Sequence, residues 1–129
     1  MSPATLLAVG MLGGAGSVAR FLLDRAITHR ADRAAGADRT PAFPLGTLAV
    51  NLTGALLLGV LVGLDPGGDT LRLLGTGLLG AYTTFSTWML ETRRLAAGGR
   101  RRAAAANVVI SLGLGLLAVW LGRELGAAL

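Results

Sequence analysis

Long apolar segments alternate with short charged ones along the chain. Asp, Glu, Arg and Lys are absent from four segments: Met1–Ala19, Thr40–Leu64, Leu73–Leu90 and Ala103–Gly122. Each segment is roughly as long as the 18 residues or more that a membrane-spanning helix needs. The pattern therefore predicts an all-α membrane protein, one transmembrane domain over residues 1–129, with helices at about 3–23, 45–64, 70–95 and 103–122.

A soluble helical bundle is the alternative for a chain this rich in helix-forming apolar residues. It is disfavoured because bundle helices turn a polar face to water, and the four segments have no such face. The amino-terminal stretch MSPATLLAVG lacks the basic start of a secretory signal, so we expect the first helix to be retained. The sequence DPGG at Asp65–Gly68 predicts a turn after the second helix.

Composition supports the membrane assignment. The mean hydropathy is +0.63, 53% of residues are hydrophobic, and there are 20 glycines. Gly10 and Gly14 form a GxxxG pair, which permits close helix contact in lipid. The absence of Cys excludes disulfides and thiolate metal sites, and His29 stands alone in a charged stretch. The stretch GGAG has neither the preceding strand nor the following Lys of a phosphate loop.

Pairs of polar or aromatic residues interrupt the apolar helices. Each pair is spaced to share one helix face: Thr47 with Asn51, Phe85 with Trp88, and Asn107 with Ser111. An amide left in hydrocarbon is unfavourable, so such faces turn toward protein or a water-filled path. Two readings stay open, because polar residues also bond transmembrane helices to one another.

No acidic residue lies within the apolar segments. Arg20 is near the end of the first predicted helix and Glu91 near the end of the third. A proton-coupled carrier needs an embedded carboxylate or His, so we expect no proton exchange at a buried acid. The amides, hydroxyls and positive edges of aromatic rings that remain suit an anion better than a cation.

The stretch GAYTTFSTW, residues 80–88, places five hydroxyl side chains inside the third apolar segment. Gly80 weakens a helix, and neighbouring Thr and Ser side chains can bond to nearby carbonyls. We expect an interruption of the helix there, which would free backbone carbonyls suited to a small cation. The alternative is an unbroken helix whose hydroxyls bond back to its own turns.

Three motifs together resemble the CrcB/Fluc fluoride channel family: GGAGSVARF (13–21), PLGTLAVNLTGALLLG (44–59) and GAYTTFSTW (80–88). Their order and spacing agree with that family over essentially the whole chain. The resemblance implies an antiparallel, dual-topology dimer of four-helix subunits, each with a broken third helix. It also implies a passive fluoride channel in the cell membrane and not an enzyme.

The resemblance also implies roles for individual residues. Asn51 matches the amide that donates to fluoride, and Phe85 the first ring whose edge faces the ion. Other matches to the fluoride path and its vestibule are Thr47, Ser86, Ser111 and Arg20. Trp88 stands where the family usually has a second Phe, and Asn107 where it usually has Tyr, so these two are departures within the implied pore. Gly80 and Thr83 match the carbonyls that hold a structural sodium ion at the dimer centre.

The distribution of Arg predicts an orientation. Apart from Arg20, nine Arg residues fall in the first and third predicted loops: Arg25, Arg30, Arg33, Arg39, Arg93, Arg94, Arg100, Arg101 and Arg102. Two Arg residues fall on the other side of the membrane, Arg72 and Arg123. The positive-inside rule then places both termini outside the cytoplasm. Such a bias is unexpected in a dual-topology homodimer, so we expect pairing with an oppositely oriented homologous subunit. Because the Arg residues flank apolar segments, they are better explained by topology than by nucleic-acid binding.

Two further functions are weighed against the fluoride channel. A small four-helix multidrug-type exporter would need an embedded Glu in the first helix, where the sequence has no acid. A non-conducting structural membrane subunit would tolerate apolar replacements at Asn51 and Phe85, whereas a channel would not.

Overall fold

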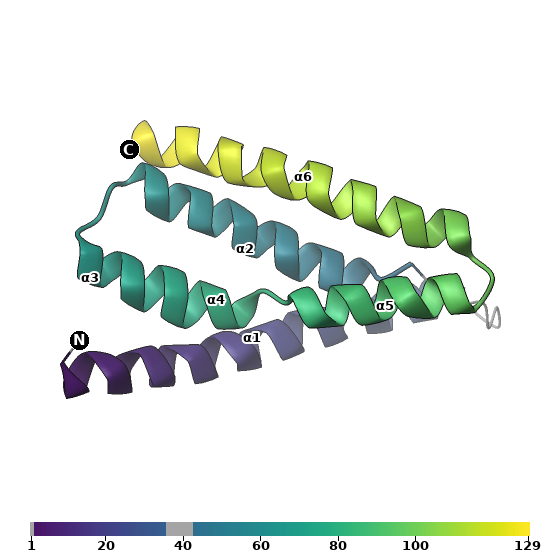
Figure 1. Ribbon diagram of the computed structural model, residues 1–129, viewed down its shortest axis with the longest axis horizontal. Helices are drawn as coiled ribbons and strands as arrows, with labels where there is room; N and C mark the ends of the chain where they lie inside the picture. The colour runs from purple at the N-terminus through teal and green to yellow at the C-terminus, as the bar shows by residue number, and fades with distance from the viewer. Residues whose placement is uncertain (1, 36–42) are drawn as a thin grey trace.

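The computed structural model describes residues 2–35 and 43–129, and every regular element among them is helical. Figure 1 shows the helices lying roughly side by side along one long axis. In chain order the elements are α1 (Pro3–Ala35), α2 (Leu45–Gly63), α3 (Gly68–Thr70), the π-helix η1 (Leu71–Leu79), α4 (Gly80–Tyr82), α5 (Phe85–Ala97) and α6 (Arg101–Ala127).

Three of these helices, α1, α2 and α6, are long and apolar enough to cross a membrane. Their large apolar side chains are largely exposed on the isolated chain, as Leu7, Val109 and Leu116 illustrate. Such an apolar surface suits lipid, and the helical backbone can be placed there because a helix satisfies its own backbone hydrogen bonds. The prediction of an all-helical membrane protein is confirmed to this extent, with three candidate spans in the described part of the chain.

The region predicted as one helix at 70–95 is divided among α3, η1, α4 and α5. In η1 the hydrogen bonds are widened by one residue, and the N–H of Gly80 accordingly bonds to the carbonyl of Gly75. Between α4 and α5 the backbone is extended, with φ/ψ of −77°/160° at Thr83 and −145°/121° at Thr84. We call these two residues the Thr83–Thr84 segment.

Two helices extend beyond their predicted ends. α1 continues to Ala35 instead of ending near residue 23, and α6 continues to Ala127 instead of ending near residue 122. The physical reason is that charge marks where lipid ends, whereas Ala- and Arg-rich stretches still favour helix in water. Arg39 and the rest of residues 36–42, which belong to the first predicted loop, lie outside the described residues.

Reciprocal glycines bring α2 and α6 into backbone contact. A Cβ added at Gly59 or Gly63 would meet the carbonyl oxygen of Val119 or Arg123. In the other direction, a Cβ at Gly122 would meet the carbonyl of Leu56, and one at Gly126 that of Val60. Both helices thus carry a small-xxx-small pair that faces the other, the pattern that permits close packing in lipid.

Within the single chain, the closest backbone contact of α1 uses a glycine outside the predicted GxxxG pair. A Cβ at Gly10 or Gly14 would meet nothing within 4 Å in the described chain. The close contact instead uses Gly16, where a Cβ would meet the carbonyl oxygen of Leu78. The GxxxG spacing correctly indicates a helix with small residues, but it does not identify which of them face a neighbour.

The ends of the helices fall into two groups. In Figure 1 both termini lie at the same end as the connection from α2 to α3. The turn between α5 and α6 lies at the opposite end, where Gly99 adopts a φ of +78° that favours glycine. The chain therefore runs back and forth along one axis, with α2 packed against both α6 and α1.

Adding a methyl group at the α2–α6 contact should destabilise the fold. In Gly59→Ala or Gly122→Ala the new Cβ meets backbone atoms, so the helices must separate, and overpacking of this kind costs about 1–3 kcal/mol or more. We expect a lower thermal unfolding temperature in detergent for both variants. Gly113→Ala is the matched control, since its Cβ would meet nothing within 4 Å. Equal unfolding temperatures for all three variants would contradict the packing described here.

Candidate functional site

The Thr83–Thr84 segment is shaped by hydroxyl groups. Thr83 Oγ1 donates to the carbonyl of Leu79 at 3.1 Å, which closes the end of α4. Thr84 Oγ1 accepts from the N–H of Thr87 at 3.3 Å and caps the start of α5. The chain can therefore leave α4 and enter α5 within two residues while the hydroxyls of Thr83 and Thr84 stay hydrogen-bonded.

Asn51, on α2, pairs with Thr84 through both ends of its amide. Its Nδ2 donates to the Thr84 carbonyl at 3.0 Å, and its Oδ1 accepts from the Thr84 N–H at 2.8 Å. The side chain thus replaces the helical partners that an extended residue loses. One hydrogen on Nδ2 is left for another acceptor, because a primary amide carries two.

These hydrogen bonds leave the backbone carbonyls of Gly80 and Thr83 without their usual helical donors. In a continuous helix the N–H of Thr84 would bond to the carbonyl of Gly80, and that of Thr87 to the carbonyl of Thr83. Here the first N–H donates to Asn51 and the second to Thr84 Oγ1. The Gly80 and Thr83 carbonyls have therefore lost their regular helical donors, which leaves them able to accept from or coordinate something else.

A cavity of about 340 Å³ lies beside this segment. Five of the predicted site residues are among those that line it, and none of its lining side chains is charged: Asn51, Gly54, Ala55, Leu58, Gly75, Leu79, Gly80, Thr83, Thr84, Phe85, Trp88 and Val119. Phe85 is 71% exposed, and its ring meets that of Trp88 edge to face, with centroids 5.6 Å apart. The cavity joins an amide, hydroxyls and ring edges in apolar surroundings.

A second cavity, of about 200 Å³, lies on the α1 side of the same segment. Arg20 and Thr47 line it together with Asp24, and Thr84 lines both cavities. The structure thus gathers Arg20 and Thr47 here, apart from the group around Asn51. Ser86 is exposed at the start of α5, with its Oγ 3.5 Å from Thr84 Oγ1.

Asn107 and Ser111, on α6, are not among the residues that line these two cavities. Asn107 is buried and bonded to α5, where its Nδ2 donates to Thr92 Oγ1 at 2.8 Å. Ser111 Oγ lies 3.5 Å from Asn107 Oδ1. In the isolated chain Asn107 therefore connects α6 to α5, whereas Ser111 contacts Asn107 within α6.

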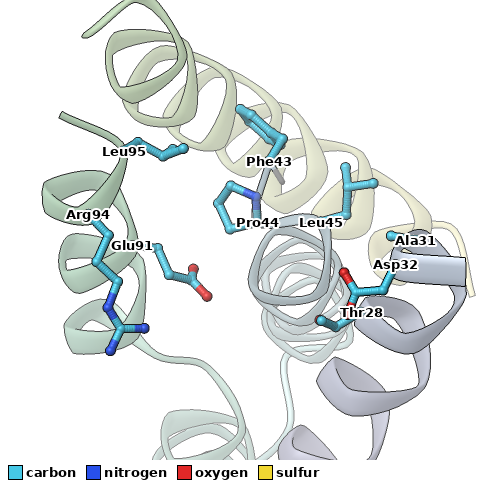
Figure 2. A pocket seen from close by; sticks show the side chains of 9 residues that line it. All are labelled: Thr28, Ala31, Asp32, Phe43, Pro44, Leu45, Glu91, Arg94 and Leu95. Atoms are coloured by element: carbon cyan, nitrogen blue, oxygen red, sulfur yellow. The ribbon is translucent and has the colours of Figure 1, made fainter. Parts of the chain in front are cut away.

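A third cavity, of about 260 Å³, lies where α1, the start of α2 and α5 meet (Figure 2). In Figure 2 the Glu91 carboxylate points from α5 toward the start of α2. Its Oε1 accepts from Thr47 Oγ1 at 3.0 Å, and its buried Oε2 has no partner among the described residues. Glu91 therefore ties α5 to α2 near the end of the molecule that holds the α5–α6 turn.

Sequence reasoning did not single out two residues of this region. Thr84 pairs with Asn51 and lines both cavities, and Thr92 accepts from Asn107. A usable signal existed for Thr92, since it follows Trp88 by four residues and so shares one face of α5 with it.

Replacing Asn51 should destabilise the Thr83–Thr84 segment. Asn51→Leu keeps a similar volume but leaves the N–H and carbonyl of Thr84 unpaired, and each unpaired buried group costs about 1–3 kcal/mol. Asn51→Asp keeps the acceptor for the Thr84 N–H but sets a carboxylate oxygen against the Thr84 carbonyl, so we expect it to be destabilising as well. Hydrogen exchange at the Thr84 amide and thermal unfolding measure both. Thr76→Val, which removes a hydroxyl of η1 that makes no bond to the described residues, is the control. Unchanged exchange in Asn51→Leu would contradict this role.

Comparison with known proteins places this geometry in a family. The family model described as CrcB-like protein, Camphor Resistance (CrcB), matches residues 7–123. That range includes every predicted site residue.

Curated relatives align with nearly the whole chain. A protein of Mycolicibacterium paratuberculosis named fluoride-specific ion channel FluC 2 is 50% identical, with 95% of this chain and 93% of that protein aligned. A fluoride-specific ion channel FluC 1 of Symbiobacterium thermophilum is 47% identical over 92% of this chain and 94% of its own. A FluC 2 of Natronomonas pharaonis is 44% identical, with both chains covered completely. With identity and coverage this high, the chain belongs to the CrcB family.

Proposed function

We propose that this protein is a passive, fluoride-selective channel that lets fluoride leave the cytoplasm. The observation that carries the proposal is the cavity beside the Thr83–Thr84 segment, where the Asn51 amide and the exposed Phe85 ring meet with no charged side chain in the lining. The relatives described above are named fluoride-specific ion channels, which supports the same substrate.

The chemistry of the cavity fits a small anion. The second hydrogen of Asn51 Nδ2 is a donor, and the edges of aromatic rings carry positive charge. The lining has no carboxylate that would repel an anion or carry a proton for exchange. Fluoride would therefore move down its electrochemical gradient, driven by the membrane voltage and without a catalytic step.

We infer that α3, η1, α4 and α5 together form one further membrane crossing, the third in chain order, interrupted at the Thr83–Thr84 segment. None of the four is long enough to span a bilayer alone, whereas residues 68–97 as a unit are. Extended backbone at this depth is tolerated where it is buried in protein or lines a cavity. Thr84 meets both conditions, because it is buried and lines the two cavities.

The site is completed by a second subunit in the proposed antiparallel, dual-topology dimer. Phe85 is 71% exposed on the isolated chain although it lines the proposed pore. A neighbouring subunit would cover this ring and close the open side of the cavity. The Arg bias described above favours an oppositely oriented homologous partner, with the termini of this chain outside the cytoplasm.

A structural sodium ion at the dimer centre would be held by the carbonyls of Gly80 and Thr83. These carbonyls fit the role because their regular helical donors are diverted to Asn51 and to Thr84 Oγ1. Carbonyl oxygens are hard ligands suited to such a cation. When bound, the ion would supply a fixed positive charge that offsets part of the penalty of bringing an anion into a low-dielectric region.

Fluoride efflux from liposomes tests the function. Purified protein should release fluoride, read by a fluoride electrode, and should release chloride far more slowly. Phe85→Leu should lower fluoride efflux about tenfold or more, the effect of about 1.4 kcal/mol on a barrier, because the ring edge is lost. Thr76→Val, outside both cavities, should leave efflux unchanged.

Each outcome of that assay is informative. Efflux only after co-expression with a homologous subunit would support the mixed dimer. Silence in both formats would overturn the proposed function and favour a non-conducting structural subunit, whereas equal fluoride and chloride efflux would overturn the proposed selectivity.

Removal of sodium tests the cation site. Replacing Na⁺ by N-methylglucamine during purification should lower the unfolding temperature, since an ion that binds the folded state stabilises it by mass action. Efflux should slow in parallel, and both effects should reverse when Na⁺ is returned. Identical stability and efflux without Na⁺ would rule out a structural sodium ion.

A further inference from the structure

Trp88, Thr92 and Asn107 form a closed set of hydrogen bonds between α5 and α6. The indole Nε1 of Trp88 donates to the backbone carbonyl of Asn107 at 3.3 Å. Asn107 Nδ2 donates to Thr92 Oγ1 at 2.8 Å, and that hydroxyl donates to the backbone carbonyl of Trp88 at 2.8 Å. The bonds return to the residue at which they started, and we call these three residues the α5–α6 network.

Two of its three residues are shielded from solvent. Asn107 is 1% exposed and Trp88 is 9% exposed in the single chain, and Thr92 is half-buried. A largely buried polar network favours one arrangement, because a rotation that breaks one of its bonds leaves a buried group unsatisfied. The Trp88 side chain is therefore fixed relative to both helices.

The bonding decides what Trp88 can offer to an ion. An indole has a single N–H and no acceptor, and this N–H is already given to Asn107. Trp88 thus has no donor left for an anion in the adjoining cavity. Its aromatic ring remains, and the Phe85 ring meets this ring at an interplanar angle of 75°.

Phe85 depends on this contact because little else in the described chain covers it. Its ring is 71% exposed, and the edge-to-face arrangement with Trp88 is the aromatic pair that the structure records. Such pairs have a preferred geometry, so a fixed Trp88 favours one orientation of Phe85.

We propose that the α5–α6 network is a positioning device that sets the orientation of the Phe85 ring, with Thr92 as a residue essential to it, and that Trp88 and Asn107 do not donate hydrogen bonds to the transported ion. The proposal rests on the proposed function only for the identity of that ion. It explains both departures from the family pattern together, because the larger ring with an N–H and the amide opposite it belong to one bonded unit.

The indole N–H provides a test that needs no transport. The chain has two Trp residues, so in Trp120→Phe protein the remaining indole signal in a ¹H–¹⁵N spectrum belongs to Trp88. We expect slow hydrogen exchange at this N–H and no shift when fluoride is added. Thr92→Val and Asn107→Leu should each speed the exchange at least several-fold. A large fluoride-dependent shift of the Trp88 signal would overturn the proposal, as would exchange that neither variant changes.

Efflux measurements test the effect on Phe85. Thr92→Val and Asn107→Leu should each lower fluoride efflux several-fold, and the double variant should be no worse than the more severe single one, because either change opens the same network. Thr76→Val controls for the loss of a helical hydroxyl. Additive losses, or wild-type efflux in Thr92→Val, would contradict the positioning role. If the unsubstituted protein proves silent, the proposed function fails, whereas the spectroscopic arm still decides the network.

Discussion

The pairing of Asn51 with Thr84 is the interaction on which the site depends. An extended backbone inside an apolar body is unstable unless its N–H and carbonyl find partners, because hydrocarbon offers none. One amide side chain on α2 supplies both partners at 2.8 and 3.0 Å. The same two bonds keep the Thr84 N–H away from the Gly80 carbonyl and place Asn51 at the edge of the cavity. Asn51 therefore both supports the backbone of the Thr83–Thr84 segment and lines the cavity, so its replacement affects stability and the cavity together.

Much of this arrangement could be predicted from the sequence, and particular residues show where prediction stops. The charge-free segments placed helices at residues that now belong to α1, α2 and α6, because the need to satisfy backbone groups in lipid leaves few alternatives. The ends of α1 and α6 were missed, because these two helices continue into polar sequence over residues 24–35 and 123–127. The unusual composition of GAYTTFSTW pointed to irregular backbone, and Thr83 and Thr84 are the extended residues within it.

The contacts between helices could not be predicted from the sequence, because they depend on how each helix is rotated toward its neighbours. Asn107 matches a position on an ion path, yet its side chain is bonded to Thr92 across the α5–α6 contact. Gly10 and Gly14 have the spacing of a contact motif, yet Gly16, Gly59 and Gly122 make the close approaches. Spacing determines which residues share a face of one helix, whereas the rotation of that face toward a neighbour is determined by the other helices. Spacing alone therefore leaves the neighbours of each face within the chain undetermined.

The glycine contact between α2 and α6 has a consequence for how the subunit is made in the cell. These two helices press backbone to backbone, but α3, η1, α4 and α5 are all synthesised between them. When α2 enters the bilayer its glycine face has no partner, and lipid must occupy the groove until α6 arrives. The pairing of Asn51 with Thr84, by contrast, joins α2 to a segment that is made before α6. Assembly of the subunit is a late event, set by the emergence of α6 from the ribosome.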